Sequence, residues 1–187
     1  MSGIFSNIES QINLFEPISL DAINKVKLLN RVDTKYVFHF NKISKVLESL
    51  QNQYCVLEID QKRLMHYKSL YYDYKDFKLY KLHQNEKLNR FKVRVRQYTD
   101  TNSMFLETKF KDNKGRTNKL RVNKSKGFDL NLKDKEFINS NTQILADDLL
   151  PSLWVYYNRI TLVGKSMTER VTIDLGLNFD NGNKKKF

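Results

Sequence analysis

Basic residues recur at every second position in several segments of the chain, a spacing that could place them side by side. The clearest segment spans residues 90–98, in which Arg94 and Arg96 alternate with apolar residues. Successive side chains of a β-strand point to opposite faces of its sheet, so these two arginines would share one face. A guanidinium group binds phosphate oxygens through paired hydrogen bonds, even where it is partly desolvated. The segment therefore predicts a strand with one phosphate-binding face and one apolar face.

The same alternation occurs in five further segments, which span residues 31–40, 103–111, 115–123, 154–163 and 168–175. Basic residues on their ionic faces include Lys35, Lys109, Lys119, Arg121 and Arg159. Glu107 and Asp174 lie on the same faces, either as metal-binding carboxylates or as ion-pair partners of neighbouring bases. For any one strand, a solvated outer face explains the pattern. Six such faces favour a sheet that curls around a polyanion, because like charges on an open face repel one another.

Other elements must support these strands. Apolar spacing predicts helices over 17–29, about 41–51 and about 139–150, and strands over 54–60 and 65–73. The segment 75–87 reads as a helix or a structured connection. Within 65–73, the side chains of Ser69, Tyr71 and Asp73 would share a face. The chain is therefore predicted to be an α+β domain with a large, mainly antiparallel sheet.

Composition narrows the class of protein. The chain has 187 residues and a formal net charge of +12, which points to a polyanionic partner. Its longest apolar run, 153–157, is too short to span a bilayer, and Met1–Phe15 lacks the features of a secretory signal. The single cysteine, Cys55, excludes an internal disulfide framework. We therefore expect a cytoplasmic protein with no transmembrane segment.

Seven short motifs, in this order along the chain, resemble those of the VTC domain, the catalytic domain of polyphosphate polymerases. This family belongs to the CYTH-like superfamily of triphosphate tunnel metalloenzymes. The motifs are Arg31-Val32-Asp33-Thr34-Lys35-Tyr36-Val37, Ser69-Leu70-Tyr71-Tyr72-Asp73 followed by Phe77 and Tyr80, Arg94-Val95-Arg96-Gln97-Tyr98, Leu106-Glu107-Thr108-Lys109, Lys119-Leu120-Arg121, Tyr157-Asn158-Arg159 and Arg170-Val171-Thr172-Ile173-Asp174. The resemblance implies an antiparallel tunnel or barrel with helices outside, whose lumen binds the triphosphate of ATP and the growing polyphosphate. The family pattern continues with a metal-binding Glu and a later Lys that do not appear before Phe187, so we expect a barrel that is incomplete at its C-terminal end.

The resemblance also assigns roles to residues. It implies phosphate binding by Lys35, Arg94, Arg96, Lys109, Lys119 and Arg159, and we add Arg121 because it shares a face with Lys119. The residues expected to act in catalysis are Arg94, Arg96, Lys109 and Arg159. A divalent ion, Mn²⁺ or Mg²⁺, would be bound by Glu107 or Asp174, with ATP as the substrate. The expected domains are an N-terminal helical segment (1–30) that packs on the barrel, the tunnel domain (31–180) and a polar basic tail (181–187).

Several functions stay open at this point. Transfer of the ATP γ-phosphate to polyphosphate is the favoured activity, and the alternatives are a triphosphatase or an inactive module that binds polyphosphate or nucleotide. A nucleic-acid-binding domain is the rival from another class, because basic strands interleaved with Tyr and Phe suit single strands. It is disfavoured because Phe91, Phe110 and Tyr156 would lie on the apolar faces. A membrane-protein partner is left open.

Overall fold

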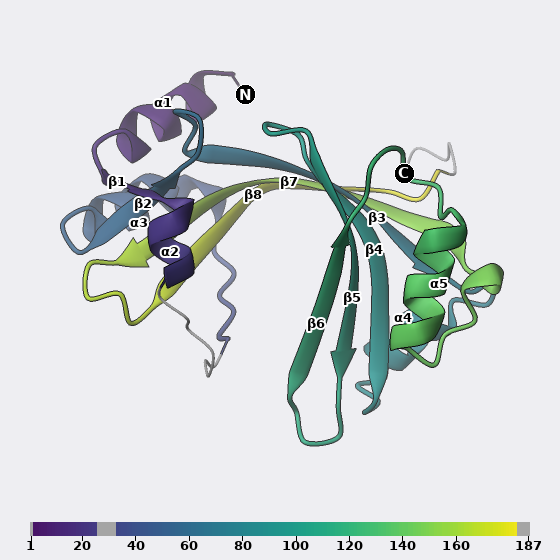
Figure 1. The fold of residues 1–187 in the computed structure, drawn as a ribbon. Coiled ribbons are helices and arrows are strands. Elements are labelled where there is room, and N and C mark those ends of the chain that lie inside the picture. The colour runs from purple at the N-terminus through teal and green to yellow at the C-terminus, as the bar shows by residue number, and fades with distance from the viewer. Residues whose placement is uncertain (1, 26–32, 183–187) are drawn as a thin grey trace. The chain divides into compact units, whose positions relative to one another are not determined.

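The computed structural model describes the backbone of residues 2–25 and 33–182, and the side chains of residues 7–24 and 33–182. These residues form two compact units (Figure 1). Of the described residues, the first unit comprises those up to residue 65 together with 158–175, and the second comprises 66–157 together with 176–182. Two long strands, β7 (Leu150–Gly164) and β8 (Arg170–Asp180), each contribute residues to both units.

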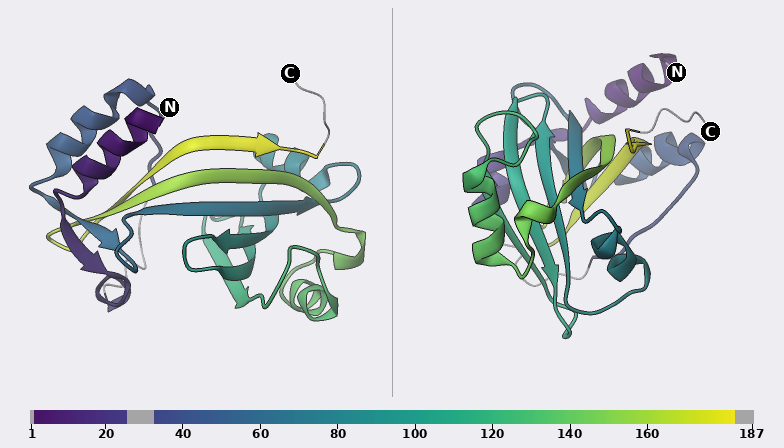
Figure 2. Two further views of the ribbon diagram at one scale, coloured as in Figure 1. Left: turned by 90° about the horizontal axis from the view of Figure 1, so that it is seen from above. Right: turned by 90° about the vertical axis from the view of Figure 1, so that its right-hand side faces the viewer.

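The first unit packs two helices on a small sheet. Its elements, besides its parts of β7 and β8, are α1 (Ser2–Ile12), β1 (Glu16–Ser19), α2 (Leu20–Lys25), the short 3₁₀ helix η1 (Phe40–Lys42), α3 (Ile43–Leu50), β2 (Tyr54–Glu58) and the first residues of β3 (Leu64–Asp73). Strand β1 pairs in parallel with β2, and β2 pairs antiparallel with β7. Strand β8 pairs with β7 (Figure 2).

The core of the first unit lies between the helices and the sheet. Ile12 of α1 and Leu47 of α3 are buried against Val56 of β2 and Ile160 of β7. Helix α3 forms where the apolar spacing predicts it, with Ile43 and Leu47 on its buried side.

The second unit holds an antiparallel sheet in the order β7-β3-β4-β5-β6. Its elements, besides its parts of β3, β7 and β8, are α4 (Lys78–Gln84), β4 (Arg90–Tyr98), β5 (Ser103–Lys111), β6 (Thr117–Asn123), α5 (Leu132–Asn141) and η2 (Ala146–Asp148). One face of the sheet carries Val93, Val95 and Leu106, all fully buried in a cluster with Ile138 of α5. This is the apolar face that the alternation predicts, and its cover leaves the other face of β4 and β5 to the charged residues.

The predicted fold class is confirmed: the chain is mixed α+β with a mainly antiparallel sheet and a few helices, as a tunnel-type fold requires. The predicted strands at 90–98 and 103–111 coincide with β4 and β5. The remaining predicted strands after residue 50 are found with shifted ends, and α4 lies within 75–87.

Three expectations differ from the structure in whole or in part. The described part of the predicted strand 31–40, residues 33–39, contains no strand, and Tyr36 and Val37 there are exposed, although Arg31 and Val32 lie outside the described residues. Alternation alone does not make a strand, because a strand also needs a neighbour for its backbone hydrogen bonds. The helix predicted over 17–29 is present as α2, but it begins only at Leu20, because Ile18 belongs to β1 and pairs with Leu57 of β2. The helix expected near 139–150 lies earlier, at α5.

The position of α5 has a clear local cause. The Asn131 side chain accepts a hydrogen bond from the backbone N–H of Asp134, and the Asp134 side chain accepts one from the N–H of Asn131. This reciprocal capping box fixes the first turn of the helix at Leu132. The Asn-x-x-Asp spacing is visible in the sequence and could have placed the helix correctly.

Candidate phosphate-binding face

Basic side chains lie in register on one face of β4, β5 and β6. In one cross-strand row, Lys92 pairs with Lys109, which pairs with Lys119. In the next row, Arg94 pairs with Glu107, which pairs with Arg121. We call this surface the cationic face; its charged residues are Arg90, Lys92, Arg94, Arg96, Glu107, Lys109, Lys111, Lys119 and Arg121. Glu107 is the only carboxylate that β4, β5 and β6 contribute to it, so the face is strongly positive.

Arg94 is held from two sides. Its Nε donates to Oε2 of Glu107 at 2.7 Å, and its Nη2 lies 2.6 Å from the same oxygen. Its Nη1 donates to the hydroxyl oxygen of Tyr71 on β3 at 2.7 Å. The Arg94 side chain keeps 26% of its surface exposed. The guanidinium group is therefore fixed in place but can still be reached by a ligand.

The surroundings of Arg94 also secure its charge. Burial alone would lower the pKa of this guanidinium group, but Tyr71 and Glu107 raise it through charge and hydrogen bonds. The net pKa shift is upward. Arg94 therefore carries its positive charge at any physiological pH.

Arg96 is the more deeply buried of the two central arginines, at 8% exposed. Its Nε donates to Oγ of Ser69 at 3.3 Å, and its Nη1 lies 4.0 Å from Oε2 of Glu107. Its guanidinium carbon lies 5.4 Å from the ring centre of Tyr67 and 5.9 Å from that of Tyr157. A desolvated guanidinium group held by rings and one shared carboxylate binds an anion more strongly than a fully hydrated one.

The remaining basic residues predicted in this unit lie on β5 and β6. Lys109, Lys119 and Arg121 are exposed, and the guanidinium carbon of Arg121 lies 4.8 Å from the ring centre of Phe105. Lys92, which the sequence analysis did not include among the site residues, has its Nζ 3.1 Å from Nε2 of His83 on α4. Five of the predicted residues, Arg94, Arg96, Lys109, Lys119 and Arg121, are thus brought together on the cationic face.

Three predicted site residues belong to the first unit. Arg159 on β7 donates from Nε and Nη2 to the two carboxylate oxygens of Asp174 on β8, at 2.6 and 2.8 Å. This bidentate pair fixes the Arg159 guanidinium group within its own sheet. Lys35 lies in the exposed stretch 33–39.

The sequence places Ser69, Tyr71 and Asp73 on one face of β3. Ser69 contacts Arg96 and Tyr71 contacts Arg94, whereas Asp73 has other partners. Asp73 is 5% exposed and accepts hydrogen bonds from the backbone N–H groups of Tyr74, Leu79 and Tyr80, each at 2.8 Å. These bonds tie the start of α4 to the end of β3. Asp73 therefore has a structural role.

The carboxylates predicted to bind a metal are both engaged by arginine. Within residues 2–25 and 33–182, no group of three or more His, Cys, Asp and Glu side chains lies close enough to hold a metal ion. Mg²⁺ commonly keeps several waters and takes one or two carboxylates together with substrate phosphates. The single carboxylate of Glu107 on the cationic face fits this mode of binding, in which phosphate oxygens supply the other ligands.

Aromatic rings also lie on the cationic face, although the sequence pattern was not used to predict a role for them. Tyr67, Tyr98, Phe105 and Tyr157 form a connected group, here called the aromatic group: the ring centres are 4.9 Å apart for Tyr67 and Tyr157, 4.9 Å for Tyr67 and Tyr98, and 5.6 Å for Tyr98 and Phe105. The signal was in the alternation, which already puts Tyr98 on the face of Arg96 and Phe105 on that of Glu107.

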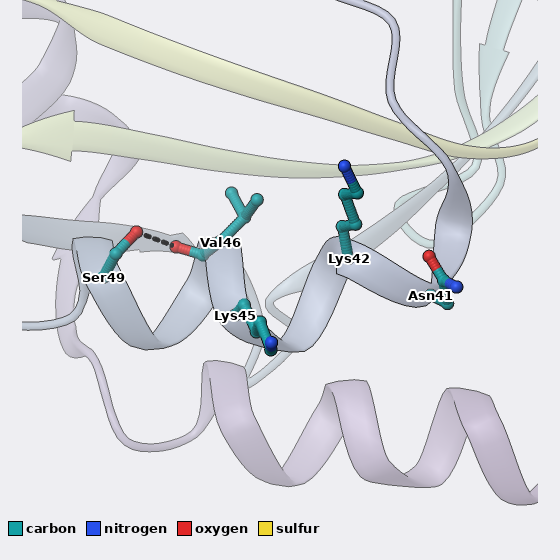
Figure 3. A pocket seen from close by; sticks show the side chains of 5 residues that line it. All are labelled: Asn41, Lys42, Lys45, Val46 and Ser49. Carbon is teal, nitrogen blue, oxygen red and sulfur yellow. Dashed lines mark hydrogen bonds between the residues drawn. The ribbon is translucent and has the colours of Figure 1, made fainter.

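A separate hollow of about 540 Å³ lies beside α3 in the first unit (Figure 3). It is lined by Asn41, Lys42, Lys45, Val46 and Ser49, and the Ser49 hydroxyl donates to the carbonyl oxygen of Val46 at 2.8 Å. In Figure 3, Lys42 and Lys45 point to different sides of the helix. None of the predicted site residues lines this hollow, so it supports no role in the chemistry considered above.

Comparison with known proteins identifies the family. The family model for the VTC domain matches residues 30–185, a range that includes all the predicted site residues. No curated protein matches the chain. No helix in the described ranges is long and apolar enough to cross a membrane. The chain therefore belongs to the VTC domain family, and this membership implies a function related to polyphosphate.

Proposed function

We propose that the cationic face binds the phosphate groups of ATP and polyphosphate, and that the protein transfers the γ-phosphoryl group of ATP to the end of a polyphosphate chain. The observation that carries this proposal is the pair of fixed, partly buried arginines, Arg94 and Arg96, at the centre of a face with a single carboxylate. Family membership supports the choice of polyphosphate as the polyanion.

The charge arrangement suits a linear polyanion better than a single phosphate ion. The rows Arg90–Lys111, Lys92–Lys109–Lys119 and Arg94–Glu107–Arg121 follow one another along the strands. Alternate residues of a strand are about 6.6 Å apart, so the rows present positive charge at regular steps. A chain of phosphates, which carries negative charge along its length, can contact several rows at once.

Phosphoryl transfer depends mainly on positioning and on neutralising charge. Arg94 and Arg96 would hold the phosphates of ATP in line with the terminal phosphate of the acceptor, and Lys109 would neutralise charge beside them. A bond forms between an oxygen of the acceptor and the γ-phosphorus, and the bond from that phosphorus to the bridging oxygen breaks, which releases ADP. The attacking oxygen is already anionic, so no general base is needed.

A divalent ion would assist at the same face. The carboxylate of Glu107 would contact it directly or through water while phosphate oxygens supply the other ligands. Bound Mg²⁺ or Mn²⁺ would polarise the γ-phosphate and screen charge between the phosphates. Because Arg94 and Arg96 share Oε2 of Glu107, the two arginines orient this carboxylate in the absence of ligand.

The test compares two double variants with the same loss of charge. Arg94→Ala/Arg96→Ala removes the centre of the face, whereas Lys114→Ala/Arg116→Ala removes two positive charges from the turn between β5 and β6. We expect the first variant to lose tripolyphosphate binding and ATP turnover by at least about 100-fold, since contacts to charged groups contribute about 1.5–3 kcal/mol each. The control should resemble the wild type. Calorimetric binding and polyphosphate formation, each with Mg²⁺, Mn²⁺ or EDTA, provide the measurements.

The same assays distinguish the other activities. Release of phosphate without polymer would identify a triphosphatase, and binding of tripolyphosphate without turnover would identify a binding module. Displacement of labelled ATP by short oligonucleotides but not by tripolyphosphate would identify a nucleic-acid-binding domain instead. If Arg94→Ala/Arg96→Ala binds and turns over like the control, the cationic face is not the site.

A further inference from the structure

The cationic face has two chemically different ends. Along β4, the side chains on this face run from Tyr98 through Arg96, Arg94 and Lys92 to Arg90. Along β5, which is antiparallel, the corresponding residues run from Phe105 through Glu107 and Lys109 to Lys111. On this face, both strands therefore carry an aromatic ring toward one end, where β4 ends and β5 begins, and only basic residues at the other end.

The aromatic end is open to a ligand. Tyr67 and Tyr157 are buried and stacked with their rings 2° from parallel, whereas Tyr98 and Phe105, at the edge of this group, are only half-buried. The exposed guanidinium group of Arg121 lies over the Phe105 ring at 4.8 Å. Phe105 is thus contacted by a side chain that is itself exposed, so this ring lies at the solvent-facing side of the aromatic group.

The rings of Tyr98 and Phe105 meet edge to face, with their planes at 81°. We propose that they form an aromatic platform for the base of a nucleoside triphosphate, which stacks on one ring beside the edge of the other, and whose phosphates extend from there toward Arg94 and Lys92. This inference rests on the proposed function, because it places the nucleoside of the substrate whose phosphates occupy the cationic face. Tyr98 and Arg94 are four residues apart in β4, so their Cα atoms are about 13 Å apart along the strand. The aromatic and charged ends are thus separated, as the base and terminal phosphates of such a ligand are.

One aromatic group at one end favours a single nucleotide over a longer nucleic acid. Proteins that bind single strands present rings on which successive bases stack. On the cationic face of β4 and β5, the positions beyond Arg96 and Phe105 are charged in both strands. The platform therefore has room for one base, followed by phosphates.

The experiment compares ATP with tripolyphosphate, which has the phosphates but no base. Tyr98→Leu and Phe105→Leu each remove a ring and keep an apolar side chain. Phe91→Leu and Phe110→Leu are the matched controls, because these rings stack on each other at 4.5 Å in the same two strands but lie on the opposite face. Dissociation constants for both ligands are measured by calorimetry on all five proteins.

We expect the wild type to bind ATP more tightly than tripolyphosphate. At least one of Tyr98→Leu and Phe105→Leu should weaken ATP binding by about 10-fold, the usual scale for loss of one stacked ring, and both should leave tripolyphosphate binding unchanged. The controls should keep the wild-type ratio of the two constants. Unchanged tripolyphosphate binding also shows that the platform variants are folded.

Two results would overturn this inference and leave the proposed function intact: equal affinity of the wild type for ATP and tripolyphosphate, or equal losses for both ligands in the platform variants. Failure of the wild type to bind either ligand would overturn the proposed function and this inference together. An ATP-specific loss in the controls as large as in the platform variants would also contradict a platform at Tyr98 and Phe105.

Discussion

At the scale of single residues, Arg94 illustrates how a carboxylate and a hydroxyl group orient a guanidinium group. A guanidinium group carries five N–H donors. Three of its nitrogen atoms contact Glu107 or Tyr71, so the group is oriented before any ligand arrives. Pre-orientation lowers the entropy that binding must remove. Because Tyr71 accepts the bond from Arg94, its own hydroxyl proton remains to be donated.

Tyr71→Phe tests this role. The variant keeps the ring but removes the oxygen that accepts from Arg94, so we expect tripolyphosphate binding to weaken by about 5-fold, the scale of one hydrogen bond of roughly 1 kcal/mol. In an Arg94→Ala background the same substitution should have no further effect, because the partner is already gone. Calorimetry on the four proteins of this cycle gives the coupling directly.

Tyr80→Phe, in a tyrosine of α4 that is 58% exposed, is the control for loss of a hydroxyl group. A Tyr71→Phe effect of the same size with and without Arg94 would contradict the positioning role and indicate that Tyr71 contacts the ligand independently.

At the scale of elements, the two faces of β4 have different roles: one packs in the core and the other carries the basic residues of the candidate site. The strand's Val93 and Val95 are fully buried on the side of α5, whereas Arg94 and Arg96 lie on the opposite, cationic face. The next layer on the apolar side is held by polar contacts: the Tyr72 hydroxyl donates to the carbonyl oxygen of Phe128, and the buried Lys124 ammonium group contacts Asp134. The segment between β6 and α5 is thereby fastened to the sheet.

The Tyr72 contact predicts a loss of stability at alkaline pH. Burial, together with the charges of Asp129 and Asp134, raises the pKa of Tyr72 well above its ordinary value of 10.0. The folded protein therefore holds the phenol proton more tightly than the unfolded chain does. Its contribution to the free energy of unfolding is complete below pH 10 and is lost as the pH rises toward the folded-state pKa.

Thermal unfolding followed by circular dichroism between pH 7 and pH 11 measures this effect. Tyr72→Phe should lower the midpoint at pH 7, because one buried hydrogen bond contributes about 1 kcal/mol. Its midpoint should then fall less steeply than that of the wild type above pH 10. Tyr80→Phe should follow the wild type at every pH. A parallel decline in Tyr72→Phe would show that Tyr72 is not the group responsible.

The sequence correctly predicts the strands in which residues alternate between apolar and ionic and in which the structure also provides a paired neighbouring strand. In 90–98 and 103–111, apolar and ionic residues alternate over most of each segment, and the two strands pair along their full length. The stretch 33–39 has the same local pattern but no strand, because pairing depends on distant parts of the chain.

The candidate site is predictable to a similar degree. Alternation places Arg94, Arg96 and Lys109 on one face correctly, but the residue that opposes each of them depends on register. The sharing of Glu107 by Arg94 and Arg96, and the position of Arg121 over Phe105, follow from the pairing of β5 with its two neighbours. These contacts could not be read from the spacing of residues within one strand.

For the whole molecule, the formal net charge of +12 attracts polyanions to the surface as well as to the site. General attraction and local contact differ in their dependence on salt. Each basic group that neutralises a phosphate of a linear polyanion releases condensed counterions, so the logarithm of affinity falls linearly with the logarithm of salt concentration. Attraction by distant charges is screened beyond about 8 Å at physiological ionic strength.

Salt dependence therefore separates the cationic face from net charge. For a long polyphosphate chain, Arg94→Ala/Arg96→Ala should reduce the slope of log affinity against log salt by about 1 to 2, because up to two phosphate contacts are lost. Lys114→Ala/Arg116→Ala lowers the net charge by the same amount, yet its slope should equal that of the wild type. Fluorescence titrations between about 50 and 300 mM salt provide the slopes. Equal slopes for the two variants would mean that overall charge governs binding. If phosphates contact defined residues, the slope must depend on which positive charges are removed.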